Sequence, residues 1–184
     1  LGEPIDMIGE ARSRTSLDIP GMQMELLKAL HKTGKPIVVL LFSGRPLLIN
    51  WLDENIPSIV QVWHLGHESG NAIADVVFGD YNPSGKLTLS FPHSVGQIPI
   101  YYNSYTTGRP YRENYRWSTH YMDSPNTPLY PFGHGLSYTK FEYSGITLSD
   151  TVLKAKKSLK ASVKVKNIGN YDGTEVVQLY IHDI

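Results

Sequence analysis

The sequence predicts an α/β protein, an α/β sandwich with a mainly parallel sheet, followed by part of an antiparallel β-sandwich. Apolar runs alternate with amphipathic stretches over residues 1–92, which is typical of strands alternating with helices. Residues 93–140 are rich in Pro, Tyr, Asn, Arg and Gly and show no lasting period. From residue 141 onward the pattern changes again. We therefore expect an α/β domain at 1–92, an irregular connector with the end of that domain at 93–140, and a β-sandwich segment at 141–184.

Three helices are expected in the first part. Residues 22–32 place their apolar side chains on one face, and Gly34 follows in the position of a C-cap. A short helix is predicted around residues 46–53. Apolar residues at helical spacing predict the third helix over residues 68–78, which Gly79 ends.

Three strands are expected between these helices. Residues 36–42 form a continuous apolar run, which is typical of a strand buried on both faces. Residues 58–63 are predicted as a second buried strand, and residues 86–91 as a third strand. A strand and helix alternation of this length favours a parallel sheet.

The pattern of residues 141–184 predicts antiparallel sheet. Residues 159–166 alternate strictly between apolar and polar side chains, which predicts a half-buried strand. A turn region at 167–173 leads to another predicted strand at 174–181. A β-sandwich needs about 100 residues, and 141–184 is much shorter. We therefore expect this domain to be incomplete.

Composition excludes several classes of function. Lys plus Arg and Asp plus Glu each number 17, so no net charge favours a nucleic-acid or anionic-membrane partner. No apolar run reaches the roughly 18 residues of a membrane helix. Without Cys there is no disulfide or thiol chemistry. The segment around Gly79 to Leu87 departs from a phosphate-binding loop, and His67-Glu68 lacks a second His. We expect no cofactor and no metal.

Several longer motifs, in order along the chain, resemble glycoside hydrolase family 3. Residues 66–87, GHESGNAIADVVFGDYNPSGKL, resemble its helix-and-turn signature. Residues 129–141, LYPFGHGLSYTKF, resemble the passage from its α/β sandwich into a fibronectin-III-like domain, and residues 108–111 fit the same connector. Near the start, residues 9–14, GEARSR, resemble the loop that bears the family's acid/base glutamate.

The resemblance implies a retaining exo-hydrolase of the β-glucosidase type. Such proteins have an N-terminal barrel domain, an α/β sandwich and a β-sandwich, and the barrel carries the aspartate nucleophile. No stretch of this chain resembles the barrel. The resemblance also implies that the α/β domain lacks its first strands, since the family's acid/base loop comes well inside that domain. The expected partners are therefore a β-linked oligosaccharide or glycoside and the barrel domain of the same polypeptide. The expected location is the periplasm or the cell exterior, and the fragment alone should be inactive.

The resemblance makes Glu10 the candidate acid/base. Retaining hydrolysis uses two carboxyl groups about 5–5.5 Å apart, one as nucleophile and one as proton donor and acceptor. The alternative reading is that Glu10 is a solvated loop carboxylate, and Glu3 is its rival for the role. Arg12 and Arg14 are candidate substrate-binding residues, although arginines in such positions more often pair with a nearby carboxylate.

Two further alternatives stay open. The chain can be a non-catalytic carbohydrate-binding or structural module, or it can serve the same mechanism on β-xylosides. The connector's aromatic residues either line a substrate mouth or pack the connector against the sandwich. These residues are Tyr101, Tyr102, Tyr105, Tyr111, Tyr115 and Trp117.

Overall fold

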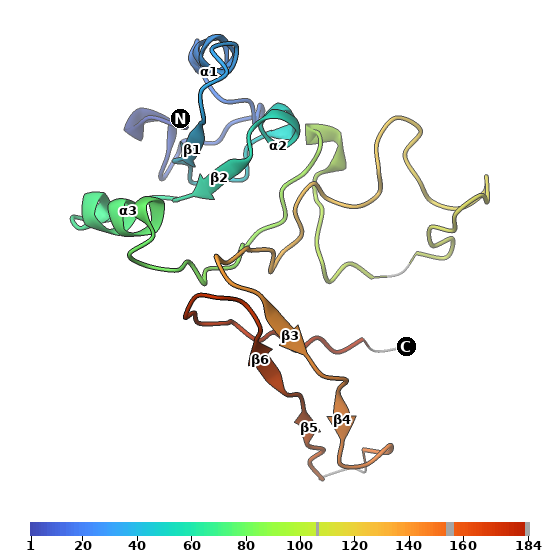
Figure 1. Cartoon of the computed structure of the whole chain (residues 1–184). Helices are drawn as coiled ribbons and strands as arrows, with labels where there is room; N and C mark the ends of the chain where they lie inside the picture. The colour runs from blue at the N-terminus through green and yellow to red at the C-terminus, as the bar shows by residue number, and fades with distance from the viewer. Residues whose placement is uncertain (106, 154–156, 183–184) are drawn as a thin grey trace. The chain divides into compact units, whose positions relative to one another are not determined.

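The computed structural model describes residues 1–105, 107–153 and 157–182 (Figure 1). It contains two compact units. The first comprises Leu1–Ile73 with Leu87–His134, and the second comprises Ala74–Lys86 with Gly135–Ile184. The boundaries expected from the sequence at residues 92 and 140 remain predictions.

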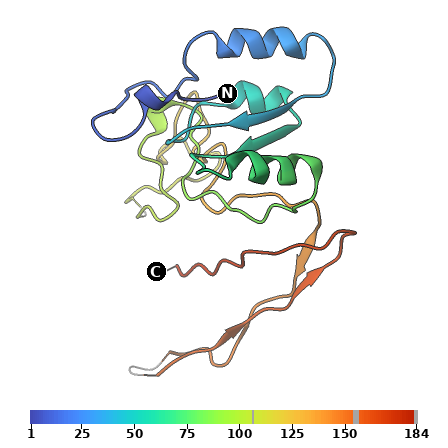
Figure 2. The ribbon, with the colours of Figure 1, turned by 90° about the vertical axis from the view of Figure 1, so that its left-hand side faces the viewer.

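The first unit is built on parallel strands, as predicted. Strand β1, Val38–Leu41, pairs in parallel with β2, Ser58–Gln61 (Figures 1 and 2). The N-terminal residues add a short third pairing, because Gly2 bridges Phe42 in parallel and the Glu3 N–H donates to the Phe42 carbonyl at 2.8 Å. A Cβ on Gly2 would lie 1.7 Å from that carbonyl oxygen, so only glycine allows this approach.

Helices α1, Gln23–His31, and α2, Asn50–Asn55, belong to the same unit. Helix α3, Ser69–Phe78, begins in the first unit and ends in the second. Two short 3₁₀ turns cover Ile5–Met7 and Val95–Gln97. All three predicted helices are present, with boundaries shifted by a few residues. The buried apolar core comprises Ile19, Leu27, Val39, Leu41, Leu47, Ile49, Leu52, Ile56 and Phe91.

The strand predicted at residues 86–91 does not join the parallel sheet. This segment instead bonds to the end of the connector: the Leu87 N–H donates to the His134 carbonyl, and Phe91 bridges Tyr130 in antiparallel fashion. The Ser90 hydroxyl accepts from the Phe132 N–H. The prediction was wrong because alternating apolar and polar residues at 86–91 favour an extended segment but do not specify its bonding partner, which here lies forty residues away.

The second unit carries antiparallel pairs. Strand β3, Phe141–Tyr143, pairs with β6, Val165–Asn167, and β4, Thr147–Leu148, pairs with β5, Ala161–Ser162. The strand expected at 159–166 is thus divided, because the Ser144 hydroxyl accepts from the Lys164 N–H between the two ladders. Residues 174–181 form no ladder with the described chain, so that predicted strand is wrong here: a strand requires a bonded neighbour.

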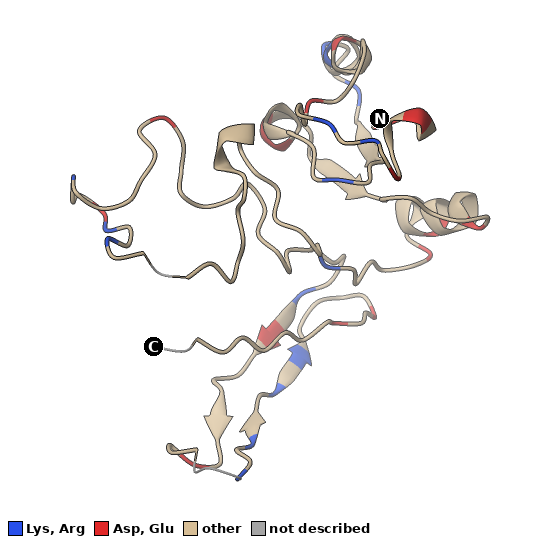
Figure 3. Cartoon of the chain, turned by 180° about the vertical axis from the view of Figure 1, so that it is seen from behind, with Lys and Arg blue, Asp and Glu red and all other residues tan. Residues whose placement is uncertain are grey.

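Charges of both signs are spread along the described chain (Figure 3). Among the described residues, no helix has the length and apolar character that crossing a membrane requires. The described part also holds three salt bridges, of which two meet at Glu3.

We expect the core to depend strongly on Leu52. Its side chain is fully buried in α2, whereas Leu26 in α1 is 58% exposed. Leu52→Ala should lower the free energy of unfolding by about 2–5 kcal/mol, because it removes buried contacts and leaves a cavity. Leu26→Ala, the same change in another helix, should stay within about 0.5 kcal/mol. Urea denaturation of the two variants measures both values, and equal losses would contradict this core assignment.

Tyr130 ties the connector to α2. Its hydroxyl donates a hydrogen bond to the Asp53 carboxylate, and its ring packs edge-on against Phe91 at 6.3 Å between ring centres. Burial raises the pKa of Tyr130 above its usual value, and the bond to Asp53 and the charge of Asp53 raise it further.

Stability should therefore fall above the ordinary tyrosine pKa of about 10. Above that pH the unfolded chain releases the Tyr130 proton while the folded chain still holds it, so the free energy of unfolding decreases as pH rises. Tyr130→Phe should reduce this alkaline slope, and Tyr105→Phe, at a residue 98% exposed, should leave it unchanged. Urea denaturation between pH 9 and pH 11 measures the slopes. An unaltered slope in Tyr130→Phe would exclude the bond as its source.

Candidate active site

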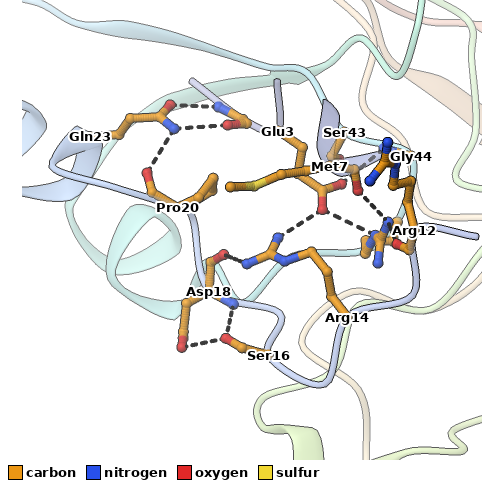
Figure 4. A network of polar contacts seen from close by, with 12 residues as sticks. Glu3, Met7, Arg12, Arg14, Ser16, Asp18, Pro20, Gln23, Ser43 and Gly44 are labelled. Atoms are coloured by element: carbon orange, nitrogen blue, oxygen red, sulfur yellow. Dashed lines mark hydrogen bonds and ion pairs between the residues drawn. The ribbon is translucent and has the colours of Figure 1, made fainter. Parts of the chain in front are cut away.

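A buried carboxylate lies at the carboxyl edge of the parallel strands. The Glu3 side chain is fully buried, and its Oε1 accepts from Arg14 Nη1 at 2.8 Å and lies 3.1 Å from Arg45 Nε (Figure 4). Its Oε2 accepts from the Gly44 N–H at 3.3 Å. Two guanidinium groups and one backbone donor thus compensate the buried charge, which would otherwise be costly to desolvate.

The N-terminal segment is held from the other side by Gln23. Its amide accepts from the Gly2 N–H and donates to the Gly2 carbonyl, both at 2.8 Å, and it also donates to the Pro20 carbonyl at 2.9 Å (Figure 4). Helix α1 therefore fixes the register of the segment that carries Glu3. The carboxylate has a defined place because backbone and side chain are both bonded.

Residues 5–16 leave the sheet edge as a loop, and Arg45 bonds it at two points. Arg45 Nη2 donates to the Met7 carbonyl and to the Arg12 carbonyl, each at 3.0 Å. Arg14 donates its second bond, from Nη2, to the Asp18 carbonyl at 3.1 Å. The loop is therefore anchored through its backbone carbonyls and through the Arg14 side chain.

Glu10 lies at the turn of this loop. Its neighbours have left-handed backbone, with φ of 96° at Gly9 and 58° at Ala11, and the Arg12 N–H closes the turn on the Gly9 carbonyl at 3.3 Å. A left-handed alanine costs about 1–2 kcal/mol, and strain of this kind concentrates at functional sites. Glu10 is exposed and forms no hydrogen bond or ion pair with the described residues.

The structure separates the residues predicted from the sequence. Arg14 is paired with Glu3, and its side chain is only 19% exposed. The Arg12 side chain is exposed, and among the described residues Arg12 is bonded only through its backbone N–H and carbonyl. Glu10 and Glu3 occupy different environments, one open and one enclosed. Sequence reasoning missed Arg45. The available signal was its place directly after the first buried strand, at the edge where parallel sheets bind ligands.

The same edge holds further polar and strained residues. Gln61 Nε2 donates to the buried Ser43 hydroxyl at 3.1 Å, while Gln61 Oε1 is buried without a hydrogen-bond partner among the described residues. Trp63, two residues past that glutamine, has φ of 54°. Left-handed backbone at a bulky residue and an unsatisfied buried acceptor are both uncommon, and both occur here at the end of β2.

The connector lines two hollows, one alone and one together with residues outside it, among them Pro46, Leu89 and Pro92. One, of about 500 Å³, is lined by Arg109, Arg112, Tyr115 and Trp117 with their small neighbours. The other, of about 270 Å³, includes Tyr102, whose ring stacks on Phe132 with 4.4 Å between centres. Aromatic rings beside polar groups suit sugar faces, and a role for these residues at a substrate mouth stays a prediction. No group of three potential metal ligands gathers within the described ranges.

The sequence matches a known family over most of its length. A family model described as the glycosyl hydrolase family 3 C-terminal domain matches residues 1–138. The chain belongs to this family. The family 3 assignment agrees with the motifs at residues 9–14, 66–87 and 129–141.

Family 3 relatives include glycosidases of two specificities. The chain is 50% identical over its whole length to a periplasmic β-glucosidase of Salmonella typhimurium, of which it covers 24%. It is 48% identical to a β-xylosidase of Formosa agariphila, of which it covers 25%. The chain therefore spans about a quarter of the length of these relatives.

Solved family 3 structures show the same fold. The β-glucosidase from Listeria innocua in complex with isofagomine matches with a TM-score of 0.87 and 43% identity, over 92% of this chain and 24% of that one. A β-glucosidase from Kluyveromyces marxianus matches with a TM-score of 0.67 and 32% identity, over 91% of this chain and 20% of that one. The α/β fold class with its antiparallel addition is thus confirmed.

We expect Glu3 and Glu10 to differ in their effect on stability. Glu3→Gln should lower the free energy of unfolding by about 1.5–3 kcal/mol, because two guanidinium groups lose their charged acceptor. Glu10→Gln, the same change at an exposed residue, should stay within about 0.5 kcal/mol. Urea denaturation at pH 7 compares them. A destabilised Glu10→Gln with a neutral Glu3→Gln would reverse the two assignments.

Proposed function

We propose that the protein containing this chain is a retaining β-glucosidase-type exo-hydrolase, with Glu10 as its acid/base. The observation that carries the proposal is the contrast between two glutamates on one loop and sheet edge. Glu10 is exposed and unbonded at a strained turn whose flanks are fixed. A carboxyl group that must reach a substrate requires this combination of access and a defined position.

The proposed chemistry uses Glu10 twice. In the first step the protonated Glu10 carboxyl gives its proton to the glycosidic oxygen while a second carboxylate attacks the anomeric carbon, and the aglycone leaves. In the second step the Glu10 carboxylate takes a proton from water, and the water oxygen replaces the enzyme at the anomeric carbon. Each step transfers one proton, so Glu10 returns to its starting form.

Glu3 is a poor candidate for that exchange. Both of its oxygens already accept bonds from N–H donors, and its side chain is fully buried. Proton transfer requires hydrogen-bond contact between the acid and the reacting oxygen, and a sugar has no access to an enclosed carboxylate. Arg12, exposed beside the turn, is proposed to contact the substrate. Arg14 is proposed to act mainly by holding Glu3.

The second carboxylate is proposed to come from outside this chain. The relatives are about four times as long as the region they share with it, and we propose an N-terminal barrel domain with an aspartate nucleophile. The isolated chain should then be inactive. We propose terminal β-glucosides as substrates and the periplasm as the location, by analogy with the Salmonella relative. The similar identity to a β-xylosidase makes β-xylosides the second candidate.

The leaving group tests the role of Glu10. In the full-length protein, Glu10→Gln should lower kcat/KM by about 10²–10⁴-fold on a β-glucoside with a poor leaving group, such as 4-methylphenyl, because the departing oxygen then lacks a proton donor. A 2,4-dinitrophenyl glucoside needs little protonation and should lose far less. Initial rates on the two aryl glucosides, measured for both proteins, give the ratio.

Glu54→Gln is the matched control, since Glu54 is an exposed carboxylate in α2. It should leave both rates unchanged. Added azide should raise the turnover of Glu10→Ala on the activated substrate and yield a β-glucosyl azide, because azide attacks without a general base. Full activity of Glu10→Gln on the 4-methylphenyl glucoside would reject the acid/base role. Absence of glucosidase and xylosidase activity in the full-length protein would favour a non-catalytic module.

A further inference from the structure

We propose that Arg45 is the positioning residue for the acid/base loop, acting through the backbone carbonyls on either side of Glu10. The inference rests on the proposed function of Glu10. Arg45 lies four residues after the end of β1 and directly after Gly44, whose N–H is bonded to Glu3 Oε2. It connects this edge of the sheet with the loop that carries the proposed acid/base.

The bonding of Arg45 matches the donors of a guanidinium group. Nη2 carries two N–H bonds and donates one to the Met7 carbonyl and one to the Arg12 carbonyl, each at 3.0 Å. Met7 precedes Glu10 by three positions and Arg12 follows it by two. One planar group thus holds both ends of a six-residue turn, and the chain between them must reverse direction.

The turn takes its shape from that constraint. With residues 7 and 12 held by one nitrogen, the backbone at Gly9 and Ala11 adopts left-handed angles of 96° and 58°. Glycine accepts such angles freely, but Ala11 does so only at a cost. The bonds from Arg45, together with the Arg12 N–H bond to the Gly9 carbonyl, offset this strain and fix the backbone on both sides of Glu10.

Glu3 orients the guanidinium. Its Oε1 lies 3.1 Å from Arg45 Nε, and its Oε2 accepts from the Gly44 N–H at 3.3 Å. The carboxylate thereby fixes the plane of Arg45, and Nη2 points to the loop. Lysine is not an equivalent, because one ammonium group lacks the planar fork that reaches Glu3 and both carbonyls at once.

The test compares Arg45→Lys and Glu3→Asp with a control variant in the full-length protein. Arg45→Lys keeps the positive charge beside Glu3 and loses the simultaneous hydrogen bonds to the Met7 and Arg12 carbonyls. It should lower kcat/KM on the 4-methylphenyl β-glucoside by about 10–100-fold, since a displacement of about 1 Å has effects of this size. The loss on the 2,4-dinitrophenyl glucoside should be at most about 3-fold, because that substrate needs little proton donation.

Lys32→Arg is the control for exchanging the two cationic side chains. Lys32 is exposed at the C-terminal end of α1, and among the described residues no hydrogen bond or ion pair joins its side chain to Glu3 or the loop. Both rates should stay within about 2-fold of the parent, as for most exposed residues. Glu3→Asp tests the contact from its other end if Arg45→Lys does not fold. Glu3→Asp keeps the negative charge but shortens the side chain by one methylene group, so the carboxylate moves away from Arg45. It should give the same selective loss of kcat/KM on the 4-methylphenyl glucoside.

The outcomes separate the two proposals. Selective loss on the poor leaving group in Arg45→Lys or Glu3→Asp supports the positioning role. Equal losses on both substrates, or no loss in a folded Arg45→Lys, overturn it while Glu10→Gln still shows the leaving-group effect. If Glu10→Gln itself shows no such effect, the acid/base assignment fails, and the positioning role fails with it.

Discussion

The buried carboxylate of Glu3 is the interaction on which the rest of this site depends. It lies on the N-terminal segment, which pairs with the end of β1, and it accepts from Arg14, Arg45 and the Gly44 N–H. Three parts of the chain therefore meet at one pair of oxygens: the segment before the loop, the loop itself and the segment that follows β1. A buried charge tolerates few arrangements of its partners, because each missing donor leaves an expensive desolvated group. The loop geometry follows from that restriction.

Much of the fold was predictable from pattern alone. The apolar segments at 36–42 and 58–63 predicted the parallel pair, and helical spacing at 22–32 and 68–78 predicted two of the helices, because the period of apolar residues indicates the type of secondary structure. The pairing of residues 86–91 was not predictable in this way. That segment bonds to residues 130–134, and nothing in its own six residues encodes the distant partner. The second unit shows the same limit, since the predicted strand at 174–181 finds no ladder within the described chain.

The site was predictable only in part, for a related reason. The loop at 9–14 is short and has no periodicity, so family resemblance alone singled out Glu10. Whether a glutamate on such a loop is enclosed or open depends on long-range contacts: Glu3 and Glu10 are seven residues apart, yet one is fully buried and the other exposed. Arg45, thirty-three residues after Arg12, enters the site through the sheet. The spacing of residues in the sequence does not predict the contact between Arg45 and the loop.

The buried network at this site consists of charged side chains, although apolar side chains could fill the same volume. Replacing a buried ion pair by apolar residues of similar volume is often neutral or stabilising, whereas removing one partner is costly. A network such as Glu3, Arg14 and Arg45 is thus a poor way to gain stability, and its cost is added to the strain at Ala11. Apolar packing has no direction, but a guanidinium group does, since its N–H bonds lie in one plane at fixed angles. We infer that direction is what this network contributes: it fixes two carbonyls around Glu10, which an apolar contact of equal area would leave free to shift.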